Sequence, residues 1–300
     1  MTAINVQSMS SAAKPAMKPS HVPTVSQAVA SINRRSPRCL AIVPVLNERE
    51  SIGKLVRHLR RALPTFDVLV VDDGSTDDTA RQVPAGTPVV SLPFNLGIGA
   101  AMQTDYRYAA LNGYDIAVQV DGDGQHRPSE VIRLVDHLLT SDVDLVVGSR
   151  FLETIKYRQS VIRAGGSWML RSFIRLLTGM NITDCTSGFR ACNKKVIHAY
   201  AHWYPEDYPE PEVILLLHRA GFQIDELPVR MRQRKNGQSS ISILGGVFYI
   251  AKVSTCLLLD MARQPWPSGK VTPDASEVNP ARHWCEPVVV VDSETEAVQA

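Results

Sequence analysis

The feature that most constrains the fold is a series of short apolar runs, each ending in polar, acidic or glycine residues. The runs are Cys39–Val45, Asp67–Val71, Val89–Leu92, Ile116–Val120 and Leu145–Val147. Segments with helical spacing of apolar residues, such as Gly99–Leu111 and Ser129–Leu139, lie between most of them. Short apolar strands that alternate with helices are typical of βαβ units and of a parallel sheet covered on both faces. The sequence therefore predicts an α/β fold with its ligand site at the carboxyl ends of the strands.

Composition excludes several other classes of protein. The 300 residues include 32 Lys and Arg against 30 Asp and Glu, a balance that argues against general nucleic-acid binding. The five cysteines are scattered and form no CxxC pair, which argues against a disulfide scaffold or a zinc module. These values indicate a reduced, cytosolic, globular protein of enzyme size.

The two ends of the chain differ in composition from its centre. Residues 1–38 contain no Asp or Glu and seven Ser, and they are interrupted by prolines, which predicts a disordered tail rather than a transit peptide. Residues 241–263 are largely apolar, but Lys252 near the centre disfavours a membrane-spanning helix. They predict an amphipathic helix that lies on a membrane surface or packs on the core. Residues 264–300, rich in proline, predict a mobile tail.

Three acidic clusters follow three of the predicted strands: Asn47–Glu48, Asp72–Asp77 and Asp121–His126. Asp121 and Asp123 are separated by one glycine, so that both carboxylates can reach one hard divalent cation, with Gln125 as a third oxygen ligand. Each cluster by itself also fits a turn or a helix cap. Their order and their shared place after apolar strands favour a functional site.

Six motifs in combination resemble those of the family 2 glycosyltransferases with the GT-A fold: PVLNE, VVDDGSTDDT, LGIGAA, VDGDGQHRP, VVGSR and SGFRA. They are most similar to the branch of dolichol-phosphate mannosyltransferases and bacterial polyprenyl-phosphate sugar transferases. The resemblance covers about Cys39 to Ser240. It implies a nucleotide-diphospho-sugar transferase domain over 39–240, a Rossmann-like sandwich with a mostly parallel central sheet. Residues 39–150 would be its nucleotide-binding half and residues 151–240 its acceptor half.

The resemblance also implies roles for single residues. A Mg²⁺ or Mn²⁺ ion would be bound by Asp121, Asp123 and Gln125. Arg150 and Arg163 match arginines that face phosphate oxygens, which suits the planar fork of a guanidinium group. For Arg163, a solvated surface position is an equally good interpretation. The residues that would bind the nucleotide are Pro44, Asn47, Glu48, Asp72, Asp73 and Asp121.

The implied reaction is an inverting, metal-dependent transfer of a sugar from a UDP-, GDP- or dTDP-sugar, in cell-envelope glycan or glycoprotein synthesis. A hydroxyl acceptor requires a general base, whereas an anionic phosphate acceptor does not. In hydroxyl-acceptor members of the family an acidic base precedes a helix that ends in glycine, and counting back from Gly221 puts Glu210 at that position. The alternative is a first-turn glutamate favoured by the helix dipole.

A basic segment, Arg230–Lys235, favours a polyprenyl phosphate as the acceptor. The candidate ligands of the acceptor phosphate are Arg232, Arg234 and Ser239. A basic loop before an amphipathic helix suits an anionic lipid head group, although a solvated charge run beside a core helix has the same pattern. We therefore expect a cytoplasmic protein, peripheral at the cytoplasmic face of a membrane. The amphipathic segment or a small membrane-protein partner would attach it.

Three other classes fit the sequence less well. A nucleotide-sugar oxidoreductase would need a Rossmann fingerprint, but Met102 occupies the third glycine position after Gly97 and Gly99. These two glycines instead indicate a close approach at a loop that enters a helix. A nucleotidyltransferase would carry a glycine-rich loop after the first strand, and Pro44–Glu48 has no glycine. A non-catalytic nucleotide-sugar-binding or scaffold protein would not need the acidic clusters together with Arg150.

Overall fold

The computed structural model describes residues 36–152, 161–206, 209–231 and 243–262. All five predicted strands are present, with ends shifted by up to two residues. The strands are β1 (Cys39–Val45), β2 (Phe66–Asp72), β3 (Val89–Ser91), β4 (Ile116–Gln119), β5 (Leu145–Ser149), β6 (Arg190–Asn193) and β7 (Ile224–Pro228). The helices are α2 (Ile52–Ala62), the short η1 (Ala80–Gln82), α3 (Ile98–Leu111), α4 (Pro128–Thr140), α5 (Val161–Thr178), α6 (Lys194–His202), α7 (Pro209–Arg219) and α8 (Ile243–Ala262).

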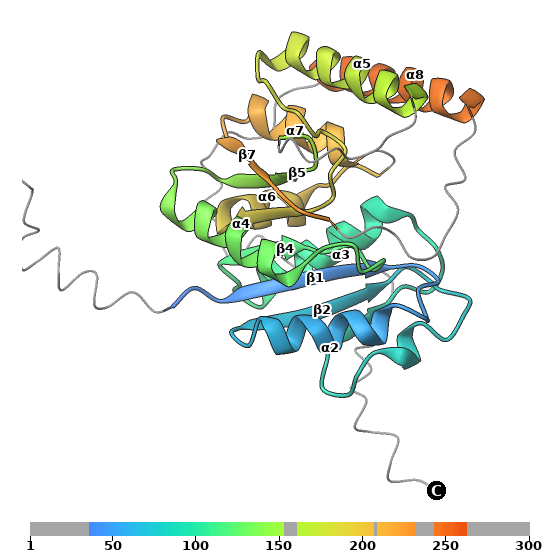
Figure 1. Cartoon of the computed structure of the whole chain (residues 1–300), viewed down its shortest axis with the longest axis vertical. Coiled ribbons are helices and arrows are strands. Elements are labelled where there is room, and N and C mark those ends of the chain that lie inside the picture. The colour runs from blue at the N-terminus through green and yellow to red at the C-terminus, as the bar shows by residue number, and fades with distance from the viewer. Residues whose placement is uncertain (1–35, 153–160, 207–208, 232–242, 263–300) are drawn as a thin grey trace, which may run out of the picture. The chain divides into compact units, whose positions relative to one another are not determined.

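The seven strands form one sheet in the order β3-β2-β1-β4-β6-β5-β7. In Figure 1, β2, β1 and β4 lie in the lower part of the molecule, and β5 and β7 lie above them. β1 pairs in parallel with β2 and β4, β2 with β3, and β5 with β7. β6 runs antiparallel to both of its neighbours, β4 and β5. The prediction of a mostly parallel central sheet is confirmed. The sheet takes strands from both predicted halves, since β6 and β7 lie within residues 151–240.

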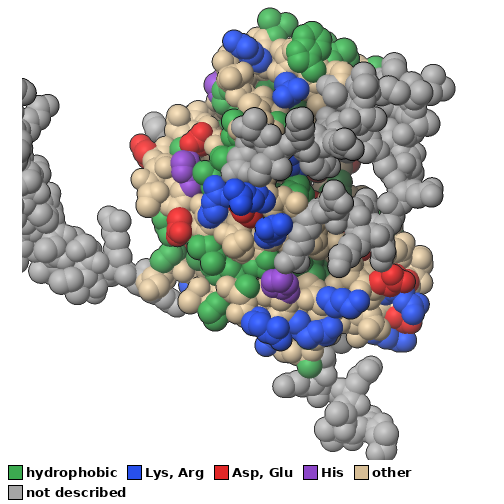
Figure 2. Space-filling view, in the orientation of Figure 1, with side chains coloured by type: hydrophobic (Ala, Val, Ile, Leu, Met, Phe, Trp, Pro, Cys, Tyr) green, Lys and Arg blue, Asp and Glu red, His purple; other side chains and the backbone are tan. Residues whose placement is uncertain are grey.

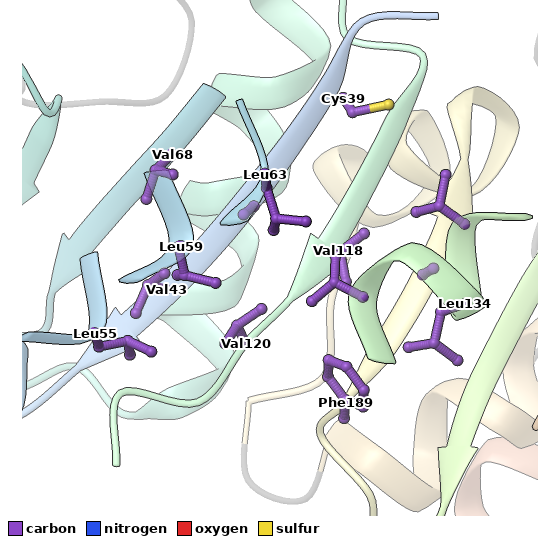
Figure 3. Close-up of a cluster of buried hydrophobic side chains, with 14 of the residues drawn as sticks. Cys39, Val43, Leu55, Leu59, Leu63, Val68, Val118, Val120, Leu134 and Phe189 are labelled. Atoms are coloured by element: carbon purple, nitrogen blue, oxygen red, sulfur yellow. The ribbon is translucent and has the colours of Figure 1, made fainter. Parts of the chain in front are cut away.

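Two hydrophobic clusters cover the two faces of the sheet. Successive side chains of a strand point to opposite faces, so Val43 of β1 packs against α2 and α4, whereas Ile42 packs on the side of α3, α6 and α7. Figure 3 shows the first cluster, in which Leu55 and Leu59 of α2 meet strand residues. Burial on both faces explains why the strands are continuous apolar runs rather than alternating ones.

A third cluster joins α5, α7 and α8. It is formed by Leu170, Ile174, Ile182, Cys185, Ile214, Leu215, Val253 and Leu257. The helix expected within residues 241–263 is therefore present as α8, and one of its sides packs on neighbouring helices. Within the described ranges, no helix has both the length and the apolar character needed to cross a membrane.

The start of α3 has the close approach expected from its two glycines. Gly97 precedes the helix with a φ of 94°, in the region that favours glycine. A Cβ atom at Gly99 would lie 2.2 Å from the carbonyl oxygen of Pro205. Both positions thus exclude a larger residue, for different reasons. The predicted tails fall almost wholly outside the described residues, since residues 1–35 and 263–300 are not described.

Candidate active site

The loops after β1 and β2 are joined by hydrogen bonds. Asn47, whose φ is 55°, donates its backbone N–H to Ser75 Oγ at 2.9 Å and accepts the Thr76 N–H on its Oδ1 at 2.9 Å. The backbone N–H of Glu48 donates to Thr79 Oγ1 at 2.8 Å. Two of the predicted nucleotide-binding residues, Asn47 and Glu48, are therefore positioned by the loop that follows β2.

Asp72 and Asp73, at the end of β2, are both buried. Asp72 Oδ1 accepts the Ser75 N–H at 3.0 Å, which closes the turn after the strand. The two carboxylate oxygens of Asp73 accept the backbone N–H groups of Leu96 at 2.8 Å and Gly97 at 3.0 Å. Asp73, one of the predicted nucleotide-binding residues, thus also fixes the loop before α3.

The loop after β4 packs directly on the end of β1. A Cβ atom on Gly122 would lie 2.7 Å from Val45 Cγ1 and 3.3 Å from the carbonyl oxygen of Pro44, so glycine allows this contact. In the same loop, Asp123 Oδ1 accepts the backbone N–H of Gln125 at 2.9 Å. The contact brings the candidate metal ligands beside the candidate nucleotide-binding residues.

Asp121 is held in a charged environment while its side chain stays 41% exposed. His126 Nε2 lies 3.0 Å from Asp121 Oδ2. Burial opposes ionisation of this carboxyl, but His126, Arg150 and a hydrogen bond from Gln119 outweigh it, and the pKa of Asp121 lies below its usual range. Asp121 is therefore an anion at neutral pH.

Arg150, the residue after β5, forms a two-point ion pair with Asp184. Its Nε lies 2.7 Å from Asp184 Oδ2 and its Nη2 lies 2.8 Å from Asp184 Oδ1, and Nη2 also donates to Thr186 Oγ1 at 2.9 Å. The Asp184 side chain is fully buried. Its loop is fixed in turn by Glu226, which accepts the backbone N–H groups of Thr183 and Asp184. Sequence reasoning missed Asp184, which lies just before the SGFRA motif.

Glu210 lies in the first turn of α7, next to a buried arginine that the sequence did not single out. Arg190 Nη2 donates to the carbonyl oxygen of Glu210 at 2.7 Å, and Arg190 itself is 2% exposed. Burial raises the pKa of Glu210, and the charge of Asp121 adds to the rise, whereas Arg190 and Arg150 oppose it. The structure therefore brings Glu210, Asp121 and Arg150 within electrostatic reach of one another.

The structure does not place every predicted site residue. Arg163 lies in α5, and its side chain is outside the described part. Arg232, Arg234 and Ser239 also lie outside the described residues. Within the described ranges there is no group of three or more His, Cys, Asp or Glu side chains suited to a metal ion. A cation at Asp121, Asp123 and Gln125 would therefore depend on two carboxylates and an amide oxygen, a donor set that suits Mg²⁺ or Mn²⁺.

A mostly parallel sheet with acidic loops at the carboxyl ends of β1, β2 and β4 is the arrangement of a nucleotide-binding α/β enzyme. Residues 40–201 match the family model of Glycosyl transferase family 2, which is more than half of the chain. The chain belongs to this family, and the protein is a glycosyltransferase.

Two curated relatives are similar over most of their length. The undecaprenyl-phosphate mannosyltransferase of Micrococcus luteus is 33% identical over 220 residues, which cover 70% of this chain and 89% of that protein. The polyprenol monophosphomannose synthase of Mycolicibacterium smegmatis is 32% identical over 248 residues, covering 77% of this chain and 92% of that protein.

A solved structure is similar in fold. Glucosyl-3-phosphoglycerate synthase from Mycobacterium tuberculosis, in complex with Mn²⁺, UDP and phosphoglyceric acid, aligns with a TM-score of 0.59. The alignment covers 82% of this chain and 86% of that chain, at 22% sequence identity. This likeness shows a GT-A-like fold, as the motifs implied.

Proposed function

We propose that the protein transfers a sugar from a nucleoside-diphosphate sugar to a polyprenyl phosphate, with inversion at the anomeric carbon. The observation that carries the proposal is the similarity to two enzymes whose names specify undecaprenyl phosphate and polyprenol monophosphate. The two similarities cover 70% and 77% of this chain, a larger share than residues 40–201, so they also include residues outside the range of the family model.

The charges around Asp121 suit this chemistry. A Mg²⁺ or Mn²⁺ ion held by Asp121, Asp123 and Gln125 would neutralise the charge that develops on the leaving diphosphate. Arg150 would contribute in the same way, because its pair with Asp184 fixes the guanidinium group before the donor binds. Pro44, Asn47, Glu48, Asp72 and Asp73 would form the nucleotide pocket. An anionic acceptor phosphate would then attack the anomeric carbon without a base.

Glu210 supports a second candidate, transfer to a hydroxyl group of a growing polysaccharide. Burial raises the pKa of this carboxyl, and it lies within electrostatic reach of Asp121. A carboxylate of raised pKa is better suited to accept a proton from an attacking hydroxyl group. In a phosphate-acceptor enzyme the same residue would have no proton to remove.

The surface of the α5–α8 pair supports the proposal that the enzyme works at a membrane. On α5, Leu176 is 79% exposed and Trp168 is 66% exposed, and on α8 both Leu258 and Leu259 are exposed. Figure 2 shows hydrophobic side chains gathered at the top of the view, over α5, with Lys and Arg among them. Exposed apolar and aromatic side chains beside basic ones are typical of helices that lie in a membrane interface. Attachment through a small membrane-protein partner would use the same surface.

Removal of the cation is expected to stop the transfer. In full-length protein supplied with Mn²⁺, we expect EDTA to abolish release of nucleoside diphosphate from the donor. Asp123→Ala should lower kcat/KM by at least about 100-fold, as expected for loss of a group that stabilises developing charge. Asp136→Ala, on the exposed side of α4, is the matched control and should keep the wild-type rate. Full activity of the chelated protein would exclude the metal-dependent mechanism.

A further inference from the structure

His126 is a buried side chain whose surroundings keep its ring in one orientation. The side chain is 1% exposed and lies in the loop between β4 and α4. Its ring stacks on the ring of Phe189, with centroids 4.3 Å apart and planes 17° apart. Phe189 is itself buried in the core cluster drawn in Figure 3. The imidazole is therefore held against the core and cannot turn away from its polar neighbour.

That polar neighbour is Asp121. His126 Nε2 lies 3.0 Å from Asp121 Oδ2. Because the ionised Asp121 carboxylate can only accept a hydrogen bond, Nε2 carries the proton in this contact. The other ring nitrogen, Nδ1, is buried and has no hydrogen-bond partner among the described residues. A phenylalanine or a leucine would fill this space without leaving a buried nitrogen unpaired, which costs free energy. The position therefore carries a histidine for its contact with Asp121 rather than for packing.

The other sides of the Asp121 carboxylate are also fixed. Gln119 donates a side-chain hydrogen bond to it. Gly188 leaves room for both groups, because a Cβ atom there would lie 2.8 Å from Gln119 Nε2 and 3.0 Å from Asp121 Oδ1. The SGFRA segment thus packs against this carboxylate and its neighbours. Gly188 lies next to Asp121 and Gln119, and Phe189 stacks on His126.

We propose that His126 is a positioning residue, whose Nε2–H holds the Asp121 carboxylate in the orientation that binds the divalent cation. The inference rests on the proposed function, because the cation at Asp121 and Asp123 belongs to that proposal. Hydrogen-bond donors behind a metal-binding carboxylate orient it, and their loss typically weakens metal binding by 10- to 100-fold. The direct contact in this chain is between His126 and one oxygen of Asp121.

Two near-isosteric variants test the inference. In His126→Gln, the amide nitrogen lies as many bonds from Cα as Nε2 does in histidine, so the donor is restored. In His126→Met, the methionine side chain has nearly the same shape as that of glutamine but has no hydrogen-bond donor. Mn²⁺ binding to the full-length proteins is measured by electron paramagnetic resonance, with whichever of UDP or GDP the wild-type protein binds.

We expect Mn²⁺ affinity to fall about tenfold in His126→Met and to stay within about threefold of wild type in His126→Gln. In the transfer assay, His126→Met should need more Mn²⁺ for half-maximal rate but recover kcat at saturating Mn²⁺. Thermal unfolding should show both variants folded, and His126→Phe, which keeps the stack on Phe189, replaces His126→Met if the latter does not fold. Equal Mn²⁺ affinities of His126→Gln and of the variant without a donor would overturn the positioning role of His126, but not the metal site. Failure of the wild-type protein to bind Mn²⁺ would overturn the metal site as well.

Discussion

Asp184→Asn is expected to lower kcat/KM about 100-fold and to destabilise the protein by about 3 kcal/mol. The amide group would present N–H groups to the Arg150 guanidinium in place of a carboxylate oxygen, and breaking a buried pair by changing one partner costs about 3–5 kcal/mol. Displacement of Arg150 would remove a group that is already in place for the leaving diphosphate, and small displacements of such groups cost about 100-fold in rate. Steady-state kinetics and urea unfolding measure the two effects.

Asp144→Asn is the matched control, because Asp144 is a buried aspartate that precedes β5, at the opposite end of the strand from Arg150. It accepts hydrogen bonds from Asn193 and from the backbone of Gln223, and it pairs with Lys195 at 3.3 Å. Its loss should lower stability and leave kcat near wild type. If both variants lose activity in proportion to stability, Asp184 has only a structural role. A double variant with Arg150→Lys should lose no more activity than the worse single variant.

Asp105→Asn is expected to stabilise the protein increasingly as the pH rises. Asp105 lies on the buried side of α3, is 0% exposed, and neither of its carboxylate oxygens has a hydrogen-bond partner in the described part of the chain. Burial raises its pKa well above the ordinary value. Below about pH 4 the carboxyl is protonated in both the folded and the unfolded state, so it contributes no pH dependence. Above that pH the unfolded state ionises first, and the free energy of unfolding of the wild type falls.

Asparagine does not ionise, so the variant lacks this loss. We expect its advantage in free energy of unfolding to grow from pH 5 to pH 8, by about 1.4 kcal/mol per pH unit for as long as the folded carboxyl stays protonated. Urea unfolding at both pH values measures it, with Asp142→Asn at an exposed position as the control. An advantage that does not change with pH would show that Asp105 is not an unpaired buried acid.

The sequence predicted the parts of the fold that depend on local patterns. The apolar runs placed β1 to β5, and the acidic residues after them marked the edge of the sheet where Asn47, Asp73 and Asp121 lie. β6 was missed because Arg190–Asn193 is short and begins with a charged residue. Arginine side chains are usually exposed, so nothing in the sequence indicated that Arg190 would be buried.

The contacts that orient the candidate site could not be predicted from local patterns. Asp184 pairs with Arg150 across 34 positions in the sequence, and Phe189 reaches His126 across the β4–β6 pairing. Such contacts depend on the order of the strands in the sheet. The periodic pattern of apolar residues predicts the strands but not their order. The SGFRA motif was the available signal, since the residues that pack under Asp121 belong to it.

The most direct test of the central claim is to follow a labelled sugar to its acceptor. Full-length protein is incubated with membranes that contain polyprenyl phosphate, Mn²⁺ or Mg²⁺, and labelled UDP-, GDP- or dTDP-sugars. We predict label in an organic-extractable, mild-acid-labile lipid, absent with Asp123→Ala and retained with Glu210→Gln. Label that enters only water-soluble glycan, and is lost with Glu210→Gln, would contradict the lipid-phosphate acceptor and establish a hydroxyl acceptor with Glu210 as the base.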